Sequence, residues 1–539
     1  MGLETLDLAV VAAYAVALIL IATIVSREKA GETKNTEDYF LAGRALPWWA
    51  IGASLIAANI SAEQIIGMSG SGFAVGLAIA SYEWMAAATL IIVGKFLLPI
   101  FLKRGIYTMP QFLEKRFGVT VKYVMSTFWL ILYTVVNLTT IMWLGATAVN
   151  SLTGLDFFPA MMALGAFAAA YSLYGGLKAV ALTDIIQVVL LVFGGILITW
   201  IALGQVSSTG SAVDGFGVLM SELPGKFDMI LSRDNPEYIN LPGIGVLLGG
   251  MWMMNISYWG FNQYIIQRAL GAKDIKEAQK GIMFAASLKI VMPFIIVIPG
   301  IAAVILAPDI AKPDQAYPEM MKLAPVGIRG LIFAALVAAI VSSLGSMMNS
   351  ISTIFTMDLV KPLVLRDAKE TTLVSVGRVA SLTALVIALF LAEPLLGSSG
   401  QVFQNIQNWT GVFTPGIVAI FALGMFWKRT TELGGLAVVI ASVVLGLSWT
   451  LICGDPVVSK ETGEIVWTPP FDPMPFMDRV GVVFLICMAL GVVVSLVTPK
   501  PSPEKPVELG DIEFGTSTGY NIGAVLIVVV LAVFYGIWW

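Results

Sequence analysis

The chain has 539 residues, of which 58% are apolar and only 12% charged, and its mean hydropathy is +0.87. A soluble globular protein carries about 25% charged residues, so this composition excludes an ordinary soluble domain and predicts an all-α polytopic membrane protein. The net charge of −4 gives no basic face for a nucleic acid. Histidine is absent, which excludes catalysis, metal ligation and proton relay by that side chain.

Apolar windows of about 20 residues, long enough to cross a bilayer as a helix, recur along the whole chain. In chain order they predict about fourteen transmembrane helices, at 7–25, 46–73, 77–102, 122–152, 158–174, 180–206, 241–268, 275–307, 324–360, 372–394, 399–427, 432–453, 475–497 and 519–539. The first window follows Glu4 and Asp7 rather than a basic segment, so we expect a retained span and not a cleaved signal. Cys453 and Cys487 lie in or at the end of apolar windows, where we expect small buried hydrophobes.

Lysine and arginine are distributed unevenly between the connections on the two sides of this predicted bundle. If the N-terminus is outside, 22 of the 31 basic residues fall in inner connections and seven in outer ones. Because cytoplasmic loops carry the excess of basic residues, this bias predicts a multi-pass protein of the cell inner (plasma) membrane with both termini on the outer side. The remaining two basic residues lie inside predicted spans. Lys95 can snorkel to the inner interface, whereas Lys289 lies in the middle of its span.

Charged, amide and hydroxyl side chains occur in the middle of several predicted spans. They are Asn59, Ser61, Glu63, Gln64, Glu83, Asn137, Asn255, Ser257, Asn262, Gln263, Lys289, Ser342, Ser343, Gln404, Asn405, Gln407 and Asn408. A charge at the centre of a bilayer costs at least ~2.5 kcal/mol and normally faces a cavity or a partner. Taken alone, a residue such as Asn137 or Ser257 is explained equally well by an interhelical hydrogen bond worth about 0.6 kcal/mol. The whole set favours a common polar cavity.

The second and seventh predicted spans carry polar residues at successive positions, so a continuous helix would turn some of them towards lipid. A helix broken at these positions avoids the problem, because unwound backbone is tolerated in a membrane where it lines a cavity. Matching interrupted spans in two halves of a chain are typical of inverted-repeat transporters. We therefore predict discontinuous helices in a core of two inverted five-helix repeats. The expected units are a peripheral helix with an inner loop (1–45), the first repeat (46–206), an outer loop (207–240), the second repeat (241–427) and three peripheral helices (428–539).

The ninth predicted span offers paired hydroxyls, at Ser342 and Ser343, close to the small residue Ala339. Backbone carbonyls at an interrupted helix can complete the oxygen shell of a hard cation, and Ala57 and Ile60 lie at the expected break in the second span. A proton site needs a titratable group, and no carboxylate stands beside these residues in the sequence. The pattern favours Na⁺ over H⁺, although packing of small residues also explains the serine pair.

Six stretches of the chain, long and in a fixed order, resemble those of one transporter family. They are EDYFLAGRALPWWAIGASLIAANISAEQIIGMSGSG, SYEWM, YSLYGGLKAVALTDIIQ, NISYWGFNQYIIQR, KGIMFAASLK and AAIVSSLGSMMNS. Through them the chain resembles the solute:sodium symporter family over nearly its whole length, and within that family the bacterial sodium/galactose and sodium/glucose cotransporters. The resemblance implies a LeuT-type fold with the inverted five-helix repeats, and transport in place of enzymatic activity.

The resemblance also implies roles for individual residues. The sugar would meet Asn59, Ser61, Glu63, Gln64, Glu83, Asn137, Asn255, Lys289 and Gln407, with Tyr258 and Trp259 as aromatic neighbours. Tyr258 would close the inner side, and the outer gate would consist of Met68, Phe73 and Phe403. Sodium would bind the carbonyls of Ala57, Ile60 and Ala339 and the hydroxyls of Ser342 and Ser343, and Asp184 would lie on its exit route.

Together these expectations describe a sodium-coupled symporter that takes a hexose, galactose or glucose, into the cell by alternating access. Na⁺ is the expected co-transported ion, with one ion per sugar, and no organic cofactor is expected. Ala86 stands where we expect a serine in the sugar branch, so the identity of the hexose stays open. Myo-inositol, a vitamin and an organic anion are alternative substrates, and a sensor that kept the transporter fold is the alternative class of protein.

Overall fold

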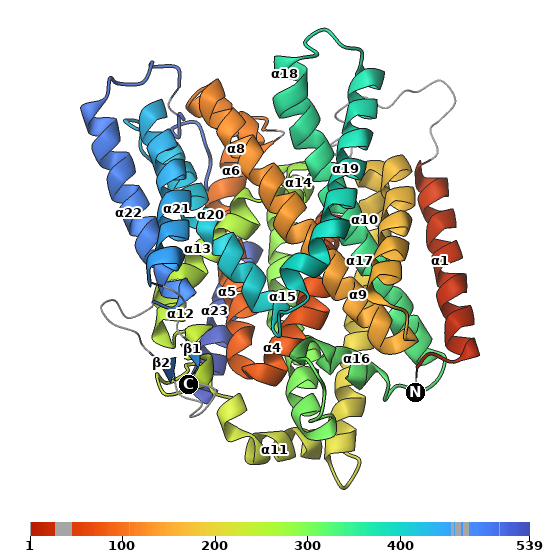
Figure 1. Cartoon of the computed structure of the whole chain (residues 1–539). Coiled ribbons are helices and arrows are strands. Elements are labelled where there is room, and N and C mark those ends of the chain that lie inside the picture. Colours follow the sequence, from red (N-terminus) through yellow and green to blue (C-terminus); the bar gives the residue numbers. More distant parts are fainter. Residues whose placement is uncertain are drawn as a thin grey trace.

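A computed structural model gives the fold as an upright bundle of helices (Figure 1). It describes residues 2–26, 46–106, 108–453, 457–458, 465–466, 474–505 and 507–539, with side chains except at 19, 22–26, 171–184, 450–453, 457–458 and 465–466. Both chain ends lie at the same end of the bundle as α11 (Ala212–Glu222), and α18 (Lys361–Leu363) lies at the opposite end (Figure 1). We call these the outer and inner ends, following the prediction from the basic residues, which the fold itself does not test.

The elements of the first half are α1 (Thr5–Ser26), α3 (Trp48–Asn59), η2 (Glu63–Met68), α4 (Ser69–Ala74), η3 (Leu77–Ala80), α5 (Ser81–Ile92), η4 (Val93–Leu97), α6 (Leu98–Lys103), α7 (Met109–Arg116), α8 (Val119–Ile131), η5 (Leu132–Leu138), α9 (Thr139–Thr153) and α10 (Phe157–Val206). The η elements are short stretches of 3-10 or π helix, and several of them continue a neighbouring α-helix.

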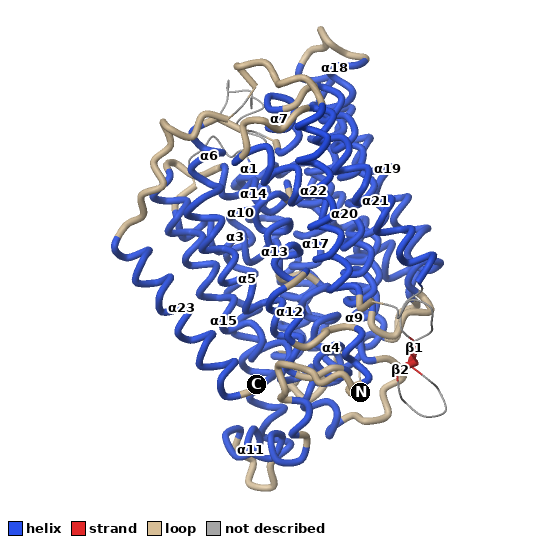
Figure 2. Tube along the Cα trace, turned by 90° about the vertical axis from the view of Figure 1, so that its left-hand side faces the viewer, coloured by secondary structure: helices blue, strands red, loops and turns tan. Residues whose placement is uncertain are grey.

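The second half begins with α11, η6 (Pro224–Lys226), η7 (Pro236–Ile239), α12 (Ile244–Leu248), α13 (Gly250–Ile256), η8 (Ser257–Phe261), α14 (Gln263–Leu270), α15 (Ile275–Leu306), η9 (Pro313–Gln315) and α16 (Ala316–Met321). It continues with α17 (Ile328–Thr353), η10 (Ile354–Val360), α18, α19 (Glu370–Leu396), α20 (Val402–Phe426), α21 (Glu432–Cys453), α22 (Phe476–Val497) and α23 (Thr518–Ile537). Strands β1 (Val457–Val458) and β2 (Ile465–Val466) pair antiparallel near the outer end (Figure 2). Helix α23 packs beside α15 at the edge of the bundle (Figure 2).

Ten of the described helices are each long and apolar enough to cross a membrane, and two bent pairs qualify when each pair is taken as one span. Two shorter apolar helices, Thr5–Leu18 and Phe157–Ala170, coincide with the first and fifth predicted windows. Each predicted window therefore holds an apolar helix. The polytopic helical fold is confirmed, whereas the number fourteen and the inverted relation of the two halves stay predictions.

The fifth and sixth predicted spans fall in one continuous element, α10, where we expected two helices separated by a connection. A straight helix of these 50 residues would be about 75 Å long, more than twice the ~30 Å hydrocarbon core of a bilayer. One straight crossing therefore cannot hold α10. The side chains of 171–184, between its two apolar parts, lie outside the described residues, and so does the predicted exit-route residue Asp184.

The second predicted span is broken, as its polar sequence indicated. Helix α3 ends at Asn59 and the helix resumes as η2 at Glu63, with a bend of 61° between the two halves. Within the break, the Ser61 amide donates to the carbonyl of Asn59 (2.8 Å), and the Glu63 amide donates to the Ser61 hydroxyl (3.2 Å). Local hydrogen bonds thus satisfy amides that have left the helix, as buried backbone requires.

The seventh predicted span is also interrupted, once before its polar residues and once at one of them, Asn262. Asn255 lies within α13 and Tyr258 within η8, and the 81° bend falls before both, at Gly249. A Cβ on the next residue, Gly250, would lie 2.1 Å from the carbonyl oxygen of Met477 in α22. Two glycines that allow this close approach therefore set the bend, rather than the polarity of the stretch. The second interruption is the extended residue Asn262 (φ −82°, ψ 119°) between η8 and α14, which lies within the polar stretch as predicted.

Helix α15 packs against both halves of the broken second span. A Cβ on Gly52 of α3 would lie 2.7 Å from the carbonyl oxygen of Gly281, and a Cβ on Gly300 would lie 2.1 Å from that of Ser69 in α4. Small residues allow helix backbones in membranes to approach this closely. Both halves of the break are therefore positioned by one element, and Lys289 lies between the two contacts along α15.

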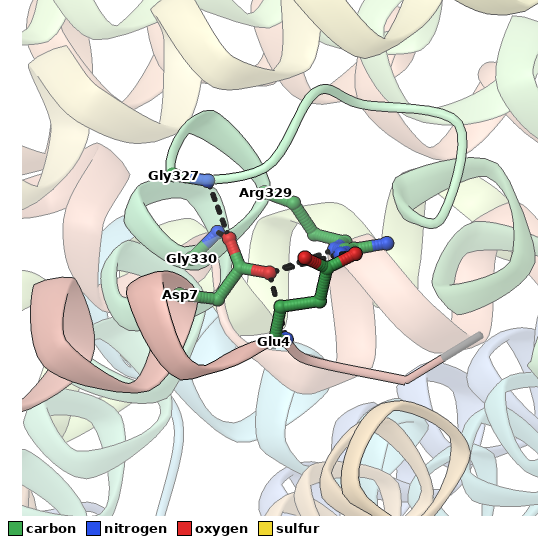
Figure 3. Close-up of polar contacts among 5 residues, drawn as sticks. All are labelled: Glu4, Asp7, Gly327, Arg329 and Gly330. Carbon is green, nitrogen blue, oxygen red and sulfur yellow. Dashed lines mark hydrogen bonds and ion pairs between the residues drawn. The ribbon is translucent and has the colours of Figure 1, made fainter.

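A buried carboxylate ties the peripheral helix α1 to the outer end of α17 (Figure 3). Asp7 is 0% exposed, and its Oδ2 accepts hydrogen bonds from Nη2 (2.9 Å) and Nε (3.1 Å) of Arg329. Its Oδ1 accepts from the amides of Gly327 (2.6 Å) and Gly330 (2.9 Å), which the first turn of α17 leaves without helical partners. The carboxylate of Glu4 lies 3.7 Å from the same guanidinium but is 55% exposed (Figure 3).

We predict that Asp7→Asn destabilises the protein and that the neighbouring change Glu4→Gln does not. Removing one member of a buried pair leaves an uncompensated charge and costs about 3–5 kcal/mol, whereas an exposed pair contributes about 0–1 kcal/mol. The measurement is the midpoint of thermal unfolding of the purified proteins in detergent, followed by size exclusion after heating. Equal midpoints for the two variants would contradict the assignment of Asp7 as the anchor of α1.

Candidate functional site

A central cavity of about 70 Å³ lies where the broken second span meets α5, η5, η8 and α20. Of the predicted sugar residues, the ones that line it are Asn59, Glu63, Gln64, Glu83, Asn137, Asn255, Tyr258, Trp259 and Gln407. Ser61 does not, because its hydroxyl is turned to the backbone of the break. Lys289 does not either, because it lies behind the residues that form the wall. The structure thus brings together side chains from five separate segments, while their roles in binding stay predictions.

Lys289 is fully buried and is neutralised by its surroundings. Its Nζ lies 2.6 Å from Oε2 of Glu83 in a buried ion pair and also donates to Oδ1 of Asn59. The same ammonium lies 5.0 Å from the ring centroid of Trp259, within the range of a cation–π interaction. A charge in this position requires such partners, since isolated burial is costly. Lys289 therefore supports three lining residues from behind rather than facing the cavity itself.

A chain of hydrogen bonds closes the cavity towards the inner end. Nδ2 of Asn59 donates to the hydroxyl of Tyr258 (3.1 Å), and that hydroxyl lies 2.5 Å from the hydroxyl of Tyr264 in α14. Nearby, the Tyr133 hydroxyl donates to Oδ1 of Asn262 (2.6 Å), the residue at which the seventh span leaves the helix. Tyr258 is thus held in place by hydroxyl and amide groups and by edge-on ring contacts with Trp259 and Tyr264.

Several polar atoms on the cavity wall are buried and make no hydrogen bond within the described protein. They are Oε1 of Glu63, Oε1 of Gln64, Oδ1 of Asn137, the hydroxyl of Tyr82 and Oγ1 of Thr410. Each buried polar atom without a partner costs about 1–3 kcal/mol, so native proteins retain few of them. Most of these atoms accept hydrogen bonds, and a ligand with several hydroxyl donors would satisfy them.

The predicted outer gate residues do not all reach the cavity. Phe403 lines it, and its ring packs edge-on against Tyr82, with the centroids 5.2 Å apart. Met68 is buried at the end of η2 and does not line the cavity, and Phe73 lies further towards the outer end in α4. There Nζ of Lys226, from the outer loop, donates to the Phe73 carbonyl (2.9 Å). Aromatic packing and this loop contact therefore cover the outer side.

The predicted cation residues lie where α17 passes the break in the second span. Ser342 and Ser343 are buried, as is Ala339, and Oγ of Ser343 lies 3.5 Å from the carbonyl oxygen of Ala58. Because the Ser61 amide bonds to Asn59, it is drawn away from the Ala57 carbonyl, which a continuous α-helix would offer it. The turn before the break thus presents the carbonyl of Ala58 to the hydroxyl of Ser343, and Ser342 is the next residue along α17. Ala58 was not in the predicted set, which named Ala57 and Ile60, and the ligand roles of all three stay predictions.

Other lining residues were not assigned a role from the sequence. Tyr82 directly precedes Glu83 in SYEWM, and Asn262 belongs to the polar stretch of the seventh span, so both had a visible signal. Thr410 and Trp129 had none, because hydroxyls and aromatic residues are common in helix interfaces. The methyl group of Ala86 also lines the cavity, at the position where a serine was expected.

Comparisons with known proteins identify the family. The sodium:solute symporter family model matches residues 39–442. A sodium/glucose cotransporter of Vibrio parahaemolyticus is 48% identical over 100% of this chain and 99% of its own length. The chain belongs to the sodium:solute symporter family. Another relative, sodium/myo-inositol cotransporter 2 of Homo sapiens, is 34% identical to this symporter over 83% of the chain and 70% of its own length.

Solved structures show the same fold. A Na⁺-coupled sialic acid symporter in a substrate-bound outward-open state has a TM-score of 0.76 at 23% identity, covering 93% of this symporter and 99% of that chain. Mhp1, a nucleobase-cation-symport-1 family transporter in a closed conformation, has a TM-score of 0.55 at 13% identity. The match covers 88% of this chain and 98% of the Mhp1 chain. The predicted membership of the family and of the LeuT-type transporter fold is confirmed.

We predict that Lys289→Ala weakens binding of glucose or galactose at least about a hundredfold, since a lost partner leaves Glu83 charged and buried. Lys95→Ala, which removes the other lysine inside a span, is the matched control and should bind as the wild type does. Binding is measured by equilibrium dialysis of the purified proteins against radiolabelled sugar at high Na⁺.

The double variant Glu83→Gln/Lys289→Met removes both charges and guards against a folding defect. It should elute as a folded protein yet bind sugar as poorly as Lys289→Ala, because the Glu83 carboxylate is lost from the wall. Wild-type affinity in either variant would contradict the assignment of this pair to the site.

Proposed function

We propose that this family member carries a hexose, glucose or galactose, into the cell together with Na⁺, by alternating access around the central cavity. The observation that carries the proposal is that the cavity wall holds buried polar atoms without a hydrogen-bond partner among the described residues. These atoms lie beside the break of the second span, whose first half, α3, packs against α17. The relative named as a sodium/glucose cotransporter, which matches the chain from end to end, supports the same substrate class.

The charges around the cavity favour a neutral substrate with many hydroxyls. The Lys289 ammonium is paired with Glu83, so no uncompensated positive charge faces the cavity at this point. Glu63 adds a carboxylate to the wall, which disfavours an organic anion. A sugar hydroxyl donates and accepts at once, and can therefore pair with Glu63, Gln64 and Asn137 in one pose. Tyr258 and Trp259 offer apolar faces to the C–H side of a pyranose ring.

The size of the cavity indicates that its walls move during transport. Its volume of about 70 Å³ is well below the roughly 300–1,000 Å³ of typical small-molecule sites. A hexose therefore requires the cavity to widen. We propose that the Phe403–Tyr82 contact opens for entry from the outer side. The Tyr258–Tyr264 contact would open for release at the inner side.

For the cation, we propose a site between the break of the second span and α17. Its oxygens would come from the carbonyls of Ala57, Ala58, Ile60 and Ala339 and from the hydroxyls of Ser342 and Ser343, with Asp184 on the exit route. Such a set of neutral oxygens suits a hard monovalent ion. One inward Na⁺ contributes about 2.3 kcal/mol per 100 mV of membrane potential, which supports accumulation of one sugar per ion.

The inverted-repeat arrangement is part of the same proposal. The two bent pairs of helices occur at the second and seventh predicted spans, which are equivalent positions in repeats that cover 46–206 and 241–427. The five-span length of each repeat would insert the second upside down relative to the first. Fourteen spans would then consist of these ten, one helix before them and three after them.

Myo-inositol is the second candidate substrate. It is also a neutral ring with many hydroxyls, and curated relatives named for its transport are 34% identical to this chain. Ala86, on the cavity wall, lacks the hydroxyl expected for the sugar branch. Unlabelled myo-inositol competing with radiolabelled glucose or galactose in the uptake experiment below distinguishes the two substrates.

We predict that an inward Na⁺ gradient drives accumulation of glucose or galactose into proteoliposomes that contain the purified protein. Ser342→Ala/Ser343→Ala should lower this uptake at least about tenfold, because two candidate ion ligands are lost, a loss of at least about 1.4 kcal/mol. Ser350→Ala, a buried serine two turns further along the same helix, is the matched control. Equal uptake under a K⁺ or proton gradient would contradict coupling to Na⁺.

A further inference from the structure

Arg268 is a buried cation to which the proposed function assigns no role. It lies in α14, just beyond the interruption at Asn262, and is 1% exposed. Its Nε donates to the hydroxyl of Ser54 in α3 (2.9 Å), and its Nη2 donates to the hydroxyl of Ser346 in α17 (2.8 Å). Its Nη1 donates to the carbonyl of Tyr264 in its own helix. One guanidinium therefore bridges two helices that are distant in the sequence.

The bridge lies next to the proposed cation site. Ser54 precedes Ala57 and Ala58 by about one turn of α3, and Ser346 follows Ser342 and Ser343 by about one turn of α17. Ser54 and Ser346 share the Arg268 guanidinium, whereas Ala58 contacts Ser343, so α3 and α17 run in opposite directions. Because α17 leads through η10 to α18 at the inner end, both steps lead towards that end. The guanidinium thus joins the same two helices as the proposed ion, about 5 Å further towards the inner end.

A bound Na⁺ and the Arg268 guanidinium would each hold α3 and α17 together. An ion that binds carbonyls of α3 and hydroxyls of α17 draws the two helices together only while it is bound. Arg268 makes the corresponding connection from within the protein, through a planar fork whose donors point in fixed directions. Its hydrogen bonds to two serine hydroxyls therefore define a spacing of α3 and α17 even before the ion arrives.

We propose that Arg268 is a positioning residue for Na⁺, which holds α3 and α17 at the spacing that their ion-binding oxygens require. The inference rests on the proposed function, because it takes Ser342, Ser343 and the carbonyls at the break as the ion's ligands. Preorganisation of this kind raises affinity by removing the cost of bringing the helices together at the moment of binding.

The positive charge of Arg268 and its bridge would have opposite effects on the affinity for Na⁺, because two cations close to each other repel. If the charge dominated, removing the guanidinium would strengthen Na⁺ binding. If the bridge dominates, as we propose, removing it weakens Na⁺ binding. Arg268→Lys separates the two effects, because it keeps the charge but cannot reach both hydroxyls with one compact ammonium group.

The test is equilibrium binding of radioactive sodium to the purified full-length protein, together with the Na⁺ dependence of sugar uptake. For Arg268→Lys we expect the Kd for Na⁺ to rise at least about tenfold. Ser54→Ala/Ser346→Ala should weaken binding in the same direction, and adding it to Arg268→Lys should have little further effect, since all three residues form one bridge. Arg378→Ala, which removes an exposed arginine of α19, is the control and should leave the Kd unchanged.

Two readouts distinguish positioning from a merely structural role. At saturating Na⁺, the maximal rate of uptake and the KM for sugar should stay within about threefold of the wild type, because the bridge acts only on the ion. A lower maximal rate with an unchanged Kd for Na⁺ would overturn the proposal, as would tighter Na⁺ binding by Arg268→Lys. If that variant fails to fold, Ser54→Ala/Ser346→Ala, which keeps the arginine, decides by the same criteria.

The failure of this inference is distinguishable from the failure of the proposed function. If the wild type binds no Na⁺, the proposed function fails, and the role of Arg268 fails with it. If the wild type binds Na⁺ and the bridge variants match its Kd, only the role of Arg268 is overturned.

Discussion

Backbone that leaves a helix inside a membrane must find new partners for its amides and carbonyls, and the centre of this molecule depends on how that requirement is met. Between Asn59 and Glu63 the amides bond locally to a neighbouring carbonyl and hydroxyl. The carbonyl of Ala58 in the preceding turn lies 3.5 Å from the hydroxyl of Ser343 in α17. Past the break, the side chains of Glu63 and Gln64 reach the cavity. Under the proposed function, this one short interruption would serve the cation on one side and the hydroxyl-rich substrate on the other.

Close packing and a buried charge keep this interruption in place. Helix α15 contacts both halves of the broken span through glycines, and between these contacts its Lys289 binds Asn59 at the break and Glu83 on the cavity wall. Asn59 in turn donates to Tyr258, which closes the inner side. Asn59 of α3 thus contacts both Lys289 of α15 and Tyr258, so a movement of α3 relative to α15 would disturb both contacts. This arrangement accounts for a lysine in the middle of a span better than a direct contact with the substrate does.

The sequence predicted much of this site because polarity inside an apolar window is visible without a structure. The windows, the break in the second span and most of the polar side chains at the cavity followed from that signal, whereas Tyr258 and Trp259 were expected only from the family resemblance. The bend at Gly249 did not, because it depends on how closely Gly250 approaches α22, which no local pattern reveals. Arg268, at the end of the seventh window, was assigned to an inner connection, and its partners, 214 and 78 residues away in the sequence, gave no local signal. Contacts between distant helices are the part that only the fold supplies.

The central claim is that Na⁺ and sugar are coupled through the break of the second span. Its most direct test is the affinity of the purified protein for glucose or galactose, measured by equilibrium dialysis with Na⁺ and with choline in its place. We predict that Na⁺ raises the affinity for sugar at least about tenfold and, by linkage, that sugar raises the affinity for Na⁺ by the same factor. Identical sugar affinity in the two media would contradict the account.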